Sequence, residues 1–147
     1  MIAVDTNILV YAHRRDSEFH LAAAGAVRRL AEGREHWAIP WPCVHEFLGI
    51  VTHTRIFHIP TPIDVAVQQI DIWRESPWLQ LIGEAGDYWP HLCETLTKGK
   101  IAGPKVHDAR VAAICRTHGI RELWSADRDF SRIPGVRIVN PILRSKQ

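Results

Sequence analysis

The side chains in this sequence with the clearest capacity for chemistry are a set of acids spread along the whole chain. They are Asp5, Glu46, Asp108, Asp127 and Asp129. Carboxylates that converge without basic partners repel one another unless divalent cations neutralise them. Ligation by oxygen alone suits Mg²⁺ or Mn²⁺ better than zinc. Two such ions about 3.5 to 4 Å apart can activate a water and stabilise a leaving oxygen, so the acids indicate phosphodiester cleavage.

The elements that must position these acids alternate between short apolar runs and amphipathic segments. The apolar runs predict strands over 2–4, 37–39, 79–82, 122–125 and 136–139. The amphipathic segments predict helices over 17–30, 43–54, 61–74, 86–97 and 105–118, with Ser17 as an N-cap. The segment 98–104 is rich in glycine and lysine and predicts a mobile surface loop. Strands that alternate with helices indicate an α/β sandwich with a parallel sheet covered on both faces.

The position of the acids relative to these elements is informative. In an open parallel sheet the ligand crevice lies beyond the carboxyl ends of the strands. Asp5 and Asp127 each follow a predicted strand at that end. Glu46 and Asp108 fall in the first turns of helices that start at the same edge. We therefore expect these four side chains to lie close together.

Each acid also has a purely structural interpretation. Asp5 could cap the helix that follows it, and Asp127 or Asp129 could belong to an Asx-type turn. Asp108 could serve only the helix dipole, and Glu46 could lie on a solvated face. Singly these interpretations compete well with a catalytic one, but the order of all the acids together favours a site.

Composition places the chain among ordinary globular proteins. Its 147 residues fit one compact domain, and 46% hydrophobic with 23% charged residues excludes a disordered, collagenous or coiled-coil chain. No apolar stretch is long enough to span a membrane, and no basic leader precedes the first strand, so a cytosolic protein is expected. The three cysteines lack any CxxC pairing and are expected to be buried thiols.

Several catalytic motifs are absent. His45-Glu46 lacks the later histidine of HExxH, and Asn7 stands where an aspartyl phosphatase would want a second Asp. Neither GxxxxGK[ST] nor GxGxxG occurs. These absences argue against a zinc hydrolase and against common modes of nucleotide binding.

The charge is unevenly distributed. Residues 1–97 hold 7 basic and 12 acidic side chains, whereas residues 98–147 hold 11 basic and 4 acidic ones. This asymmetry indicates a polyanionic partner near the last third of the chain. The candidates for phosphate contact are Arg14, Arg15, Lys98, Lys100, Lys105, Arg128 and Arg132.

Four motifs in a fixed order carry a resemblance to a known family. They are Asp5-Thr6-Asn7 after the first strand, Glu46 on a helix, His107-Asp108-Ala109-Arg110 on a late helix, and Ser125-Ala126-Asp127-Arg128-Asp129-Phe130 after a late strand. In this order they resemble the PIN-domain ribonucleases, and size and spacing are most similar to the VapC-type toxins of toxin-antitoxin pairs. The resemblance spans Ile2 to Pro141 and implies that Thr6 and Asn7 hold the first turn.

The resemblance implies a PIN-like three-layer sandwich, with a short-stranded parallel central sheet and helices on both faces, as a single nuclease domain over residues 1–147. It also implies a Mg²⁺- or Mn²⁺-dependent endoribonuclease with RNA as substrate, a cognate antitoxin as partner and a homodimeric state, located in the cytoplasm without membrane attachment. The implied catalytic acids are Asp5, Glu46, Asp108 and Asp127. The implied metal ligands are Asp5, Asp108, Asp127 and Asp129.

The last motif leaves open which residue is the main fourth acid. If the strand continues through Arg128, residues two apart project to the same side and both carboxylates face the metal. If the chain turns at Ala126, only Asp127 keeps that direction, and Asp129 caps the turn that leads to Phe130. We favour Asp127 as ligand because it comes first after the strand.

Two alternative functions fit the same fold. One is a housekeeping nuclease that processes RNA, and the other is an RNA-binding module without catalysis. Intact acids at all four motif positions argue against the second. A small antitoxin gene immediately upstream would favour the toxin over the processing enzyme.

Overall fold

A computed structural model describes residues 1–144 of the chain, leaving aside the side chains of residues 131, 132 and 144. Five short strands form one sheet in the order β3-β2-β1-β4-β5, and every adjacent pair is parallel. The strands are β1 (Ile2–Val4), β2 (Trp37–Pro40), β3 (Leu79–Ile82), β4 (Glu122–Trp124) and β5 (Arg137–Val139). The parallel α/β sheet predicted from the sequence is confirmed.

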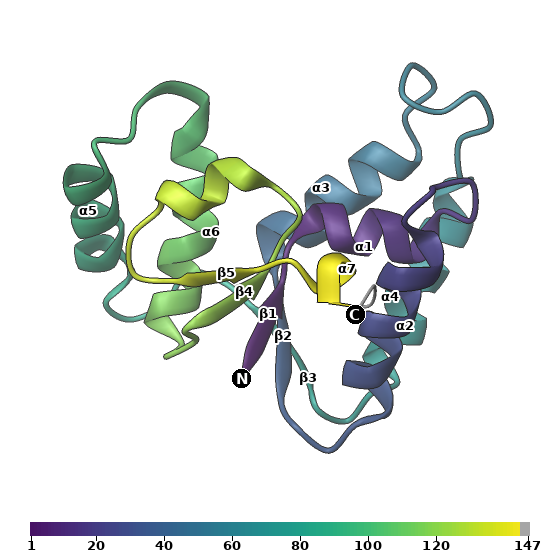
Figure 1. Cartoon of the computed structure of the whole chain (residues 1–147), viewed down its shortest axis with the longest axis horizontal. Helices are drawn as coiled ribbons and strands as arrows, with labels where there is room; N and C mark the ends of the chain where they lie inside the picture. Colours follow the sequence, from purple (N-terminus) through teal and green to yellow (C-terminus); the bar gives the residue numbers. More distant parts are fainter. Residues whose placement is uncertain (145–147) are drawn as a thin grey trace.

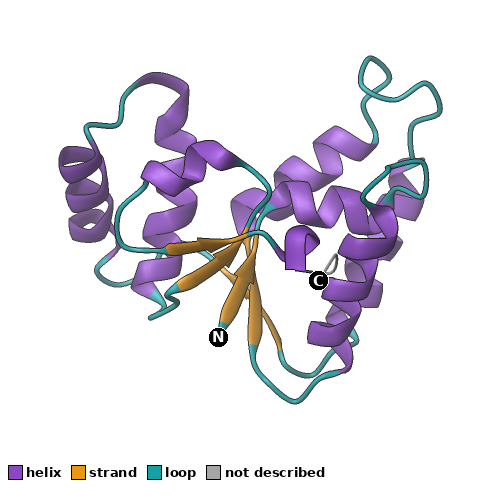
Figure 2. Cartoon of the chain, in the orientation of Figure 1, coloured by secondary structure: helices purple, strands orange, loops and turns teal. Residues whose placement is uncertain are grey.

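Helices cover both faces of this sheet (Figures 1 and 2). One face carries α1 (Thr6–His13), α2 (His20–Glu32), α3 (Trp41–Val51) and α4 (Ile63–Arg74), and the other carries α5 (Tyr88–Gly99) and α6 (Val106–Thr117). Short turns complete the fold: η1 (Gly103–Lys105), η2 (Arg128–Arg132) and α7 (Pro141–Arg144). The result is the three-layer sandwich that was expected. Among the described residues, no helix has the length and apolar character needed to cross a bilayer.

The three central strands, β1, β2 and β4, are short but largely buried, because both faces of the sheet are covered. Every residue of β2 is buried, and Trp37 has none of its surface exposed. Its indole N–H donates to Ser76 Oγ at 3.1 Å, which satisfies the polar atom of a large core side chain. Phe47 of α3 is equally buried, and its ring packs on that of Trp73 from α4 with centroids 5.2 Å apart. These contacts fix α3 and α4 against the sheet.

The order of the strands defines where a ligand can bind. From β1 the chain crosses to β2 on one side, whereas β4 lies on the other side of β1. After β1 the chain continues toward β2, and after β4 it continues toward β5, in the opposite direction along the sheet. Open α/β sheets bind ligands at such a switch point. The backbone N–H of Asp5 donates to the carbonyl of Trp124 at 2.9 Å, which joins the two strand ends.

Several predicted boundaries differ from those observed. Helix α3 begins at Trp41 because Pro42 fits a first helical turn, where its missing N–H is not needed, and this places Glu46 in the second turn. Helix α2 begins at His20, and Ser17 accepts a hydrogen bond from Phe19 N at 3.1 Å before the helix instead of capping it. The loop predicted over 98–104 is longer than the observed one. Helix α5 continues to Gly99 and η1 begins at Gly103, so only three residues lie between them.

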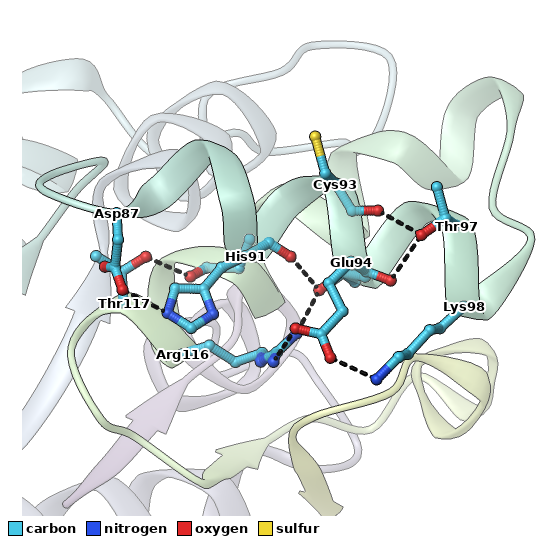
Figure 3. Close-up of polar contacts among 10 residues, drawn as sticks. Asp87, His91, Cys93, Glu94, Thr97, Lys98, Arg116 and Thr117 are labelled. Carbon is cyan, nitrogen blue, oxygen red and sulfur yellow. Dashed lines mark hydrogen bonds and ion pairs between the residues drawn. The ribbon is translucent and has the colours of Figure 1, made fainter.

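A polar cluster fastens α5 to α6 (Figure 3). Arg116 of α6 donates to Glu94 at 2.9 Å and to Thr95 Oγ1 at 3.2 Å, and Lys98 donates to the other oxygen of Glu94 at 2.6 Å. Donation from Lys98 and Arg116 lowers the pKa of Glu94 to about 2. The stem of Arg116 also runs against Gly135, which adopts φ +91°. A Cβ at Gly135 would lie 2.6 Å from Arg116 Cδ, so the Arg116 side chain would have to shift to admit it.

We predict that Gly135→Ala destabilises the fold more than Gly86→Ala does. Both glycines have positive φ, but a Cβ at Gly86 would meet nothing within 4 Å. Gly86→Ala should therefore cost only backbone strain, about 1 kcal/mol, whereas Gly135→Ala adds the clash with Arg116 and should cost about 2 to 3 kcal/mol. Urea denaturation of both variants measures the difference. Equal losses of stability would show that the contact with Arg116 relaxes freely.

Candidate active site

Four of the five predicted acids line one cavity at the carboxyl ends of β1 and β4. The cavity has a volume of about 440 Å³, and Asp5, Glu46, Asp108 and Asp127 are among its lining residues. They come from the start of α1, from α3, from the first turn of α6 and from the start of η2. Residues that are far apart in the sequence are thus brought to a single edge of the sheet, as expected.

Asp5 is the most deeply buried of these acids, with 6% of its surface exposed. Ser125 Oγ donates to one carboxylate oxygen at 2.8 Å, and the thiol of Cys43 donates to the other over 3.6 Å. Asp5 occupies the N-cap position of α1, yet its side chain makes no capping hydrogen bond. The interpretation of Asp5 as a helix cap is therefore wrong, because its carboxylate is directed across to β4 and α3.

The electrostatic environment of Asp5 resists ionisation. Burial raises the pKa of Asp5 from 3.8 to about 6, against the lowering effect of hydrogen bonds from Ser125, the Thr6 backbone and Cys43. The negative charge of Glu46 adds to the rise. No basic side chain takes part in setting this pKa. A buried carboxylate without a basic partner is costly unless a cation or a proton accompanies it.

A hydrogen-bond network centred on Ser125 ties the first and last motifs together. Ser125 Oγ accepts from Asn7 Nδ2 at 3.2 Å and from the backbone N–H of Asp127 at 3.1 Å while it donates to Asp5. The side-chain oxygen of Asn7 accepts from the backbone N–H of Ala126 at 3.1 Å. Asn7 therefore holds the segment after β4, whereas the resemblance implied that it holds the first turn. The roles of Ser125 and Cys43 were not predicted, because neither residue type at its position signals a carboxylate partner.

Glu46 and Asp108 approach the cavity from opposite faces of the sheet. Glu46 is exposed and accepts a hydrogen bond from Thr6 Oγ1 at 3.3 Å. Asp108 is half-buried, and desolvation raises its pKa, with further increases from the charges of Asp127, Glu46 and Asp129. The acids are therefore close enough to repel one another.

The structure changes the roles expected for the last two acids. Strand β4 ends at Trp124, so the chain turns, and Asp127 accepts a hydrogen bond from the backbone N–H of Asp129 at 2.9 Å. The expectation that Asp129 caps this turn is wrong: Asp127 is the cap and still lines the cavity. Asp129 is exposed and lines a neighbouring cavity together with Asp108.

The donor set fits a hard divalent cation. It consists of carboxylates, which Mg²⁺ and Mn²⁺ prefer, and the pKa values of Asp5 and Asp108 are raised mainly by burial, with a further rise from the neighbouring acids. Within the described part of the chain, however, no three His, Cys, Asp or Glu side chains converge into a metal-binding group. The acids are thus gathered in one cavity and do not form a closed ligand cage.

Basic residues around the cavity differ from those expected. Arg110 lines it and forms an ion pair with Glu84 from the loop after β3, and His45 and His107 are exposed at its wall. Arg110 was missed because a helical spacing of two from Asp108 does not predict a shared face. Among the predicted phosphate contacts, Arg14 is instead held by Asp16, and the side chain of Arg132 lies outside the described residues.

Comparisons of sequence and of structure with known proteins point to the same family. A family model described as PIN domain matches residues 2–136. Ribonuclease VapC48 of Mycobacterium tuberculosis is 36% identical over 137 residues, which cover 93% of this chain and 94% of the relative. A solved structure of VapBC2 from Rickettsia felis, bound to a DNA fragment from its promoter, superposes with a TM-score of 0.68 at 20% identity, covering 95% of this chain and 98% of that one. VapC20 of M. tuberculosis, described as a toxin that cleaves the sarcin-ricin loop, superposes with a TM-score of 0.64 at 20% identity over 89% and 93%.

We predict that Asp5→Asn stabilises the protein in the presence of a chelator. The pKa of Asp5 is raised on folding, so the native state binds the proton more tightly, and the free energy of unfolding falls as pH rises from about 4 to about 6. Asn keeps an oxygen that can accept from Ser125 and removes the charge. Above pH 7 the variant should be more stable by about 2 to 3 kcal/mol.

Urea denaturation between pH 4 and 8 tests this prediction, with Asp64→Asn as the control because Asp64 is an exposed acid in the first turn of α4. The control should keep the pH dependence of the parent, and Asp5→Asn should lose most of it. If the curves of Asp5→Asn and its parent stay parallel across this range, burial of Asp5 does not set the pH dependence.

Proposed function

The chain belongs to the PIN-domain family of VapC ribonucleases, and we propose that it is a metal-dependent endoribonuclease acting as the toxin of a toxin-antitoxin pair. The observation that carries the proposal is the meeting of Asp5, Glu46, Asp108 and Asp127 in one cavity at the switch point of the sheet. The family accounts for the ribonuclease activity. The metal requirement is supported by the all-carboxylate donor set and by the raised pKa of Asp5.

Asp5, Asp108 and Asp127 would hold Mg²⁺ or Mn²⁺, with Glu46 as a further acid at the cavity wall and Asp129 in an outer position. When bound, such a cation supplies Lewis acidity that activates water and neutralises charge on phosphate oxygens. Hydrolysis of this kind needs no side-chain nucleophile. The carboxylates that line the cavity would bind the cation, and the reaction does not require a serine, threonine or cysteine nucleophile there.

The task of the surrounding residues is to hold these carboxylates in place. Ser125 and Cys43 each donate to one oxygen of Asp5, which fixes the plane of its carboxylate. Asp127 is held by its own turn, through its bond to the Asp129 N–H. These three hydrogen bonds would hold Asp5 and Asp127 in position before RNA arrives.

Arg110 is suited to bind a phosphate oxygen beside the acids. Arg110 is one of the residues that line the cavity, and the ion pair of its guanidinium with Glu84 ties it to the loop after β3. Glu84 is itself exposed, and donation from Arg110 lowers its pKa. Planar guanidinium donors bind phosphate well, so Arg110 would orient the backbone of the RNA at the site.

Exposed apolar side chains support a protein partner, which we propose to be a cognate antitoxin, and support self-association as a dimer. On α4, Ile63, Val67 and Ile72 are 59%, 46% and 51% exposed, and Leu21 of α2 is 86% exposed. Exposed apolar side chains of this kind are found where a protein partner binds, and Ile63 and Val67, four residues apart, lie on one face of α4. VapBC2 of R. felis, a structural relative of this chain, was solved together with DNA from its promoter.

A purely RNA-binding role is disfavoured by the burial of Asp5. A binding module gains nothing from an acid that repels phosphate and is costly to bury, whereas a metal-dependent nuclease needs it. A housekeeping nuclease of the same fold would share the site. The two are distinguished by whether expression of the chain arrests growth and whether a neighbouring small protein reverses the arrest.

We predict that Asp5→Asn and Asp127→Asn each reduce RNA cleavage by about 100-fold or more, because each removes one charge from the metal-binding acids. Asp127→Asn keeps an oxygen that can accept from the Asp129 N–H, so it should remain folded. Asp129→Asn should retain most of the activity. The measurement is cleavage of bacterial ribosomal and transfer RNA in Mg²⁺ or Mn²⁺, with product ends mapped by sequencing.

Chelation should abolish the activity of the parent protein, and added Mn²⁺ should restore it. Normal cleavage by Asp127→Asn together with loss of activity in Asp129→Asn would reverse the assignment of the fourth acid. Full activity in Asp5→Asn would remove the proposed site.

A further inference from the structure

A second cavity borders the candidate active site on the side of α5 and α6. It has a volume of about 290 Å³ and shares Asp108 with the first cavity, and its other charged lining residues are Lys100, Lys105 and Asp129. Resting on the function proposed above, we propose that this second cavity binds a backbone phosphate of the RNA next to the phosphate that is cleaved. Lys100 and Lys105 would be its phosphate-binding residues.

The two lysines are available for an external anion. Both side chains are exposed. Among the described residues neither lysine forms an ion pair, although two acids line the same cavity. Lys98 differs, because its ammonium group is paired with Glu94, which also binds Arg116 of α6 (Figure 3). A lysine ammonium is a compact point charge that suits a phosphate oxygen.

The backbone at Lys100 gives independent support. Helix α5 ends in a Schellman arrangement, in which Ile101 N donates to the Leu96 carbonyl at 3.0 Å and Lys100 N donates to the Thr97 carbonyl at 3.3 Å. Lys100 occupies the left-handed position of this motif, with φ 49°, and is the one described residue other than glycine with positive φ. Glycine is the usual residue at such a position because it has no Cβ. A lysine kept there at the expense of backbone strain indicates a use for its side chain.

The loop that carries Lys100 is also closely packed. A Cβ on the preceding Gly99 would lie 2.8 Å from Ile101 Cδ1 and 3.1 Å from Pro134 Cδ, so the backbone passes directly over the segment before β5. Lys105 lies at the end of η1, three residues before Asp108 in the first turn of α6. Both lysines are therefore attached to backbone that is fixed relative to the acids.

The charge of the cavity favours an RNA strand over a free anion. Asp108 and Asp129 line it together with the lysines, so a free phosphate ion gains little net attraction. A phosphate that belongs to a strand already held at the neighbouring acids and Arg110 reaches the lysines without a separate binding event. Because the two cavities share Asp108, they are adjacent, and a strand held in the first one has a second phosphate within reach of the other.

The test measures RNA binding and stability together in the full chain. Lys100→Gly and Lys105→Gln are made in an Asp5→Asn background that does not cleave, and binding of a fluorescein-labelled single-stranded RNA of mixed sequence is followed by anisotropy in Mg²⁺. Arg34→Gln is the matched control, because it removes one positive charge from an exposed residue before β2, at the opposite edge of the sheet.

Lys100→Gly should raise the melting temperature by about 2 to 4 °C, because glycine adopts the left-handed backbone conformation without strain. The same variant should bind RNA about fivefold more weakly, and the slope of log K against log salt should fall by about 0.7. Lys105→Gln should lower affinity and slope by similar amounts, and Arg34→Gln should change neither. A residue with only a structural role would not combine higher stability with weaker binding.

The proposal is overturned if the lysine variants bind RNA with the affinity and salt slope of Arg34→Gln, or if the parent binds no RNA. It is also overturned if millimolar inorganic phosphate displaces the RNA as effectively in the parent as unlabelled RNA does, because the cavity would then be a free-anion site. Failure of the proposed function is separate: it would appear as absence of cleavage by the wild-type chain in Mg²⁺ or Mn²⁺.

Discussion

Burial of the Asp5 carboxylate between three elements is the interaction on which the rest of the site depends. Its oxygens are held by Ser125 after β4 and by Cys43 of α3, and its backbone N–H joins the end of β4. Burial raises the pKa of Asp5 to about 6 although these hydrogen bonds lower it, so the fold maintains a carboxylate that resists ionisation in the absence of a cation. The free-energy cost of burying this carboxylate is offset when a metal ion binds and neutralises its charge.

The sheet provides the positions that this arrangement needs. Because β1 lies between β2 and β4, the connections that follow β1 and β4 pass to opposite faces of the sheet and leave a crevice between them. Helix α3 brings Glu46 to that crevice from one face, and the first turn of α6 brings Asp108 from the other. The α5–α6 loop then extends the same edge with Lys100 and Lys105, so the acids and these lysines line neighbouring cavities.

Much of this could be predicted from the sequence, because strand ends and acids follow simple rules. The five strands and the meeting of four acids follow from apolar runs and from the geometry of parallel sheets. Which side chain bonds to which could not be predicted: Cys43 resembles any core residue, and whether Asp127 or Asp129 caps the turn depends on where β4 ends. The ion pair of Arg110 with Glu84 could not be predicted either, because it joins segments 26 residues apart in the sequence.

The central claim is that Asp5, Asp108 and Asp127 share a divalent cation, and the most direct test is a crystal structure of the protein with Mn²⁺, located by its anomalous scattering. The proposed site predicts an anomalous peak bounded by these three carboxylates, at ligand distances of about 2.0 to 2.3 Å, and no such peak in crystals of Asp5→Asn. A protein that cleaves RNA in the same Mn²⁺ concentration but shows no peak in this cavity, or an equal peak in Asp5→Asn, would contradict the claim.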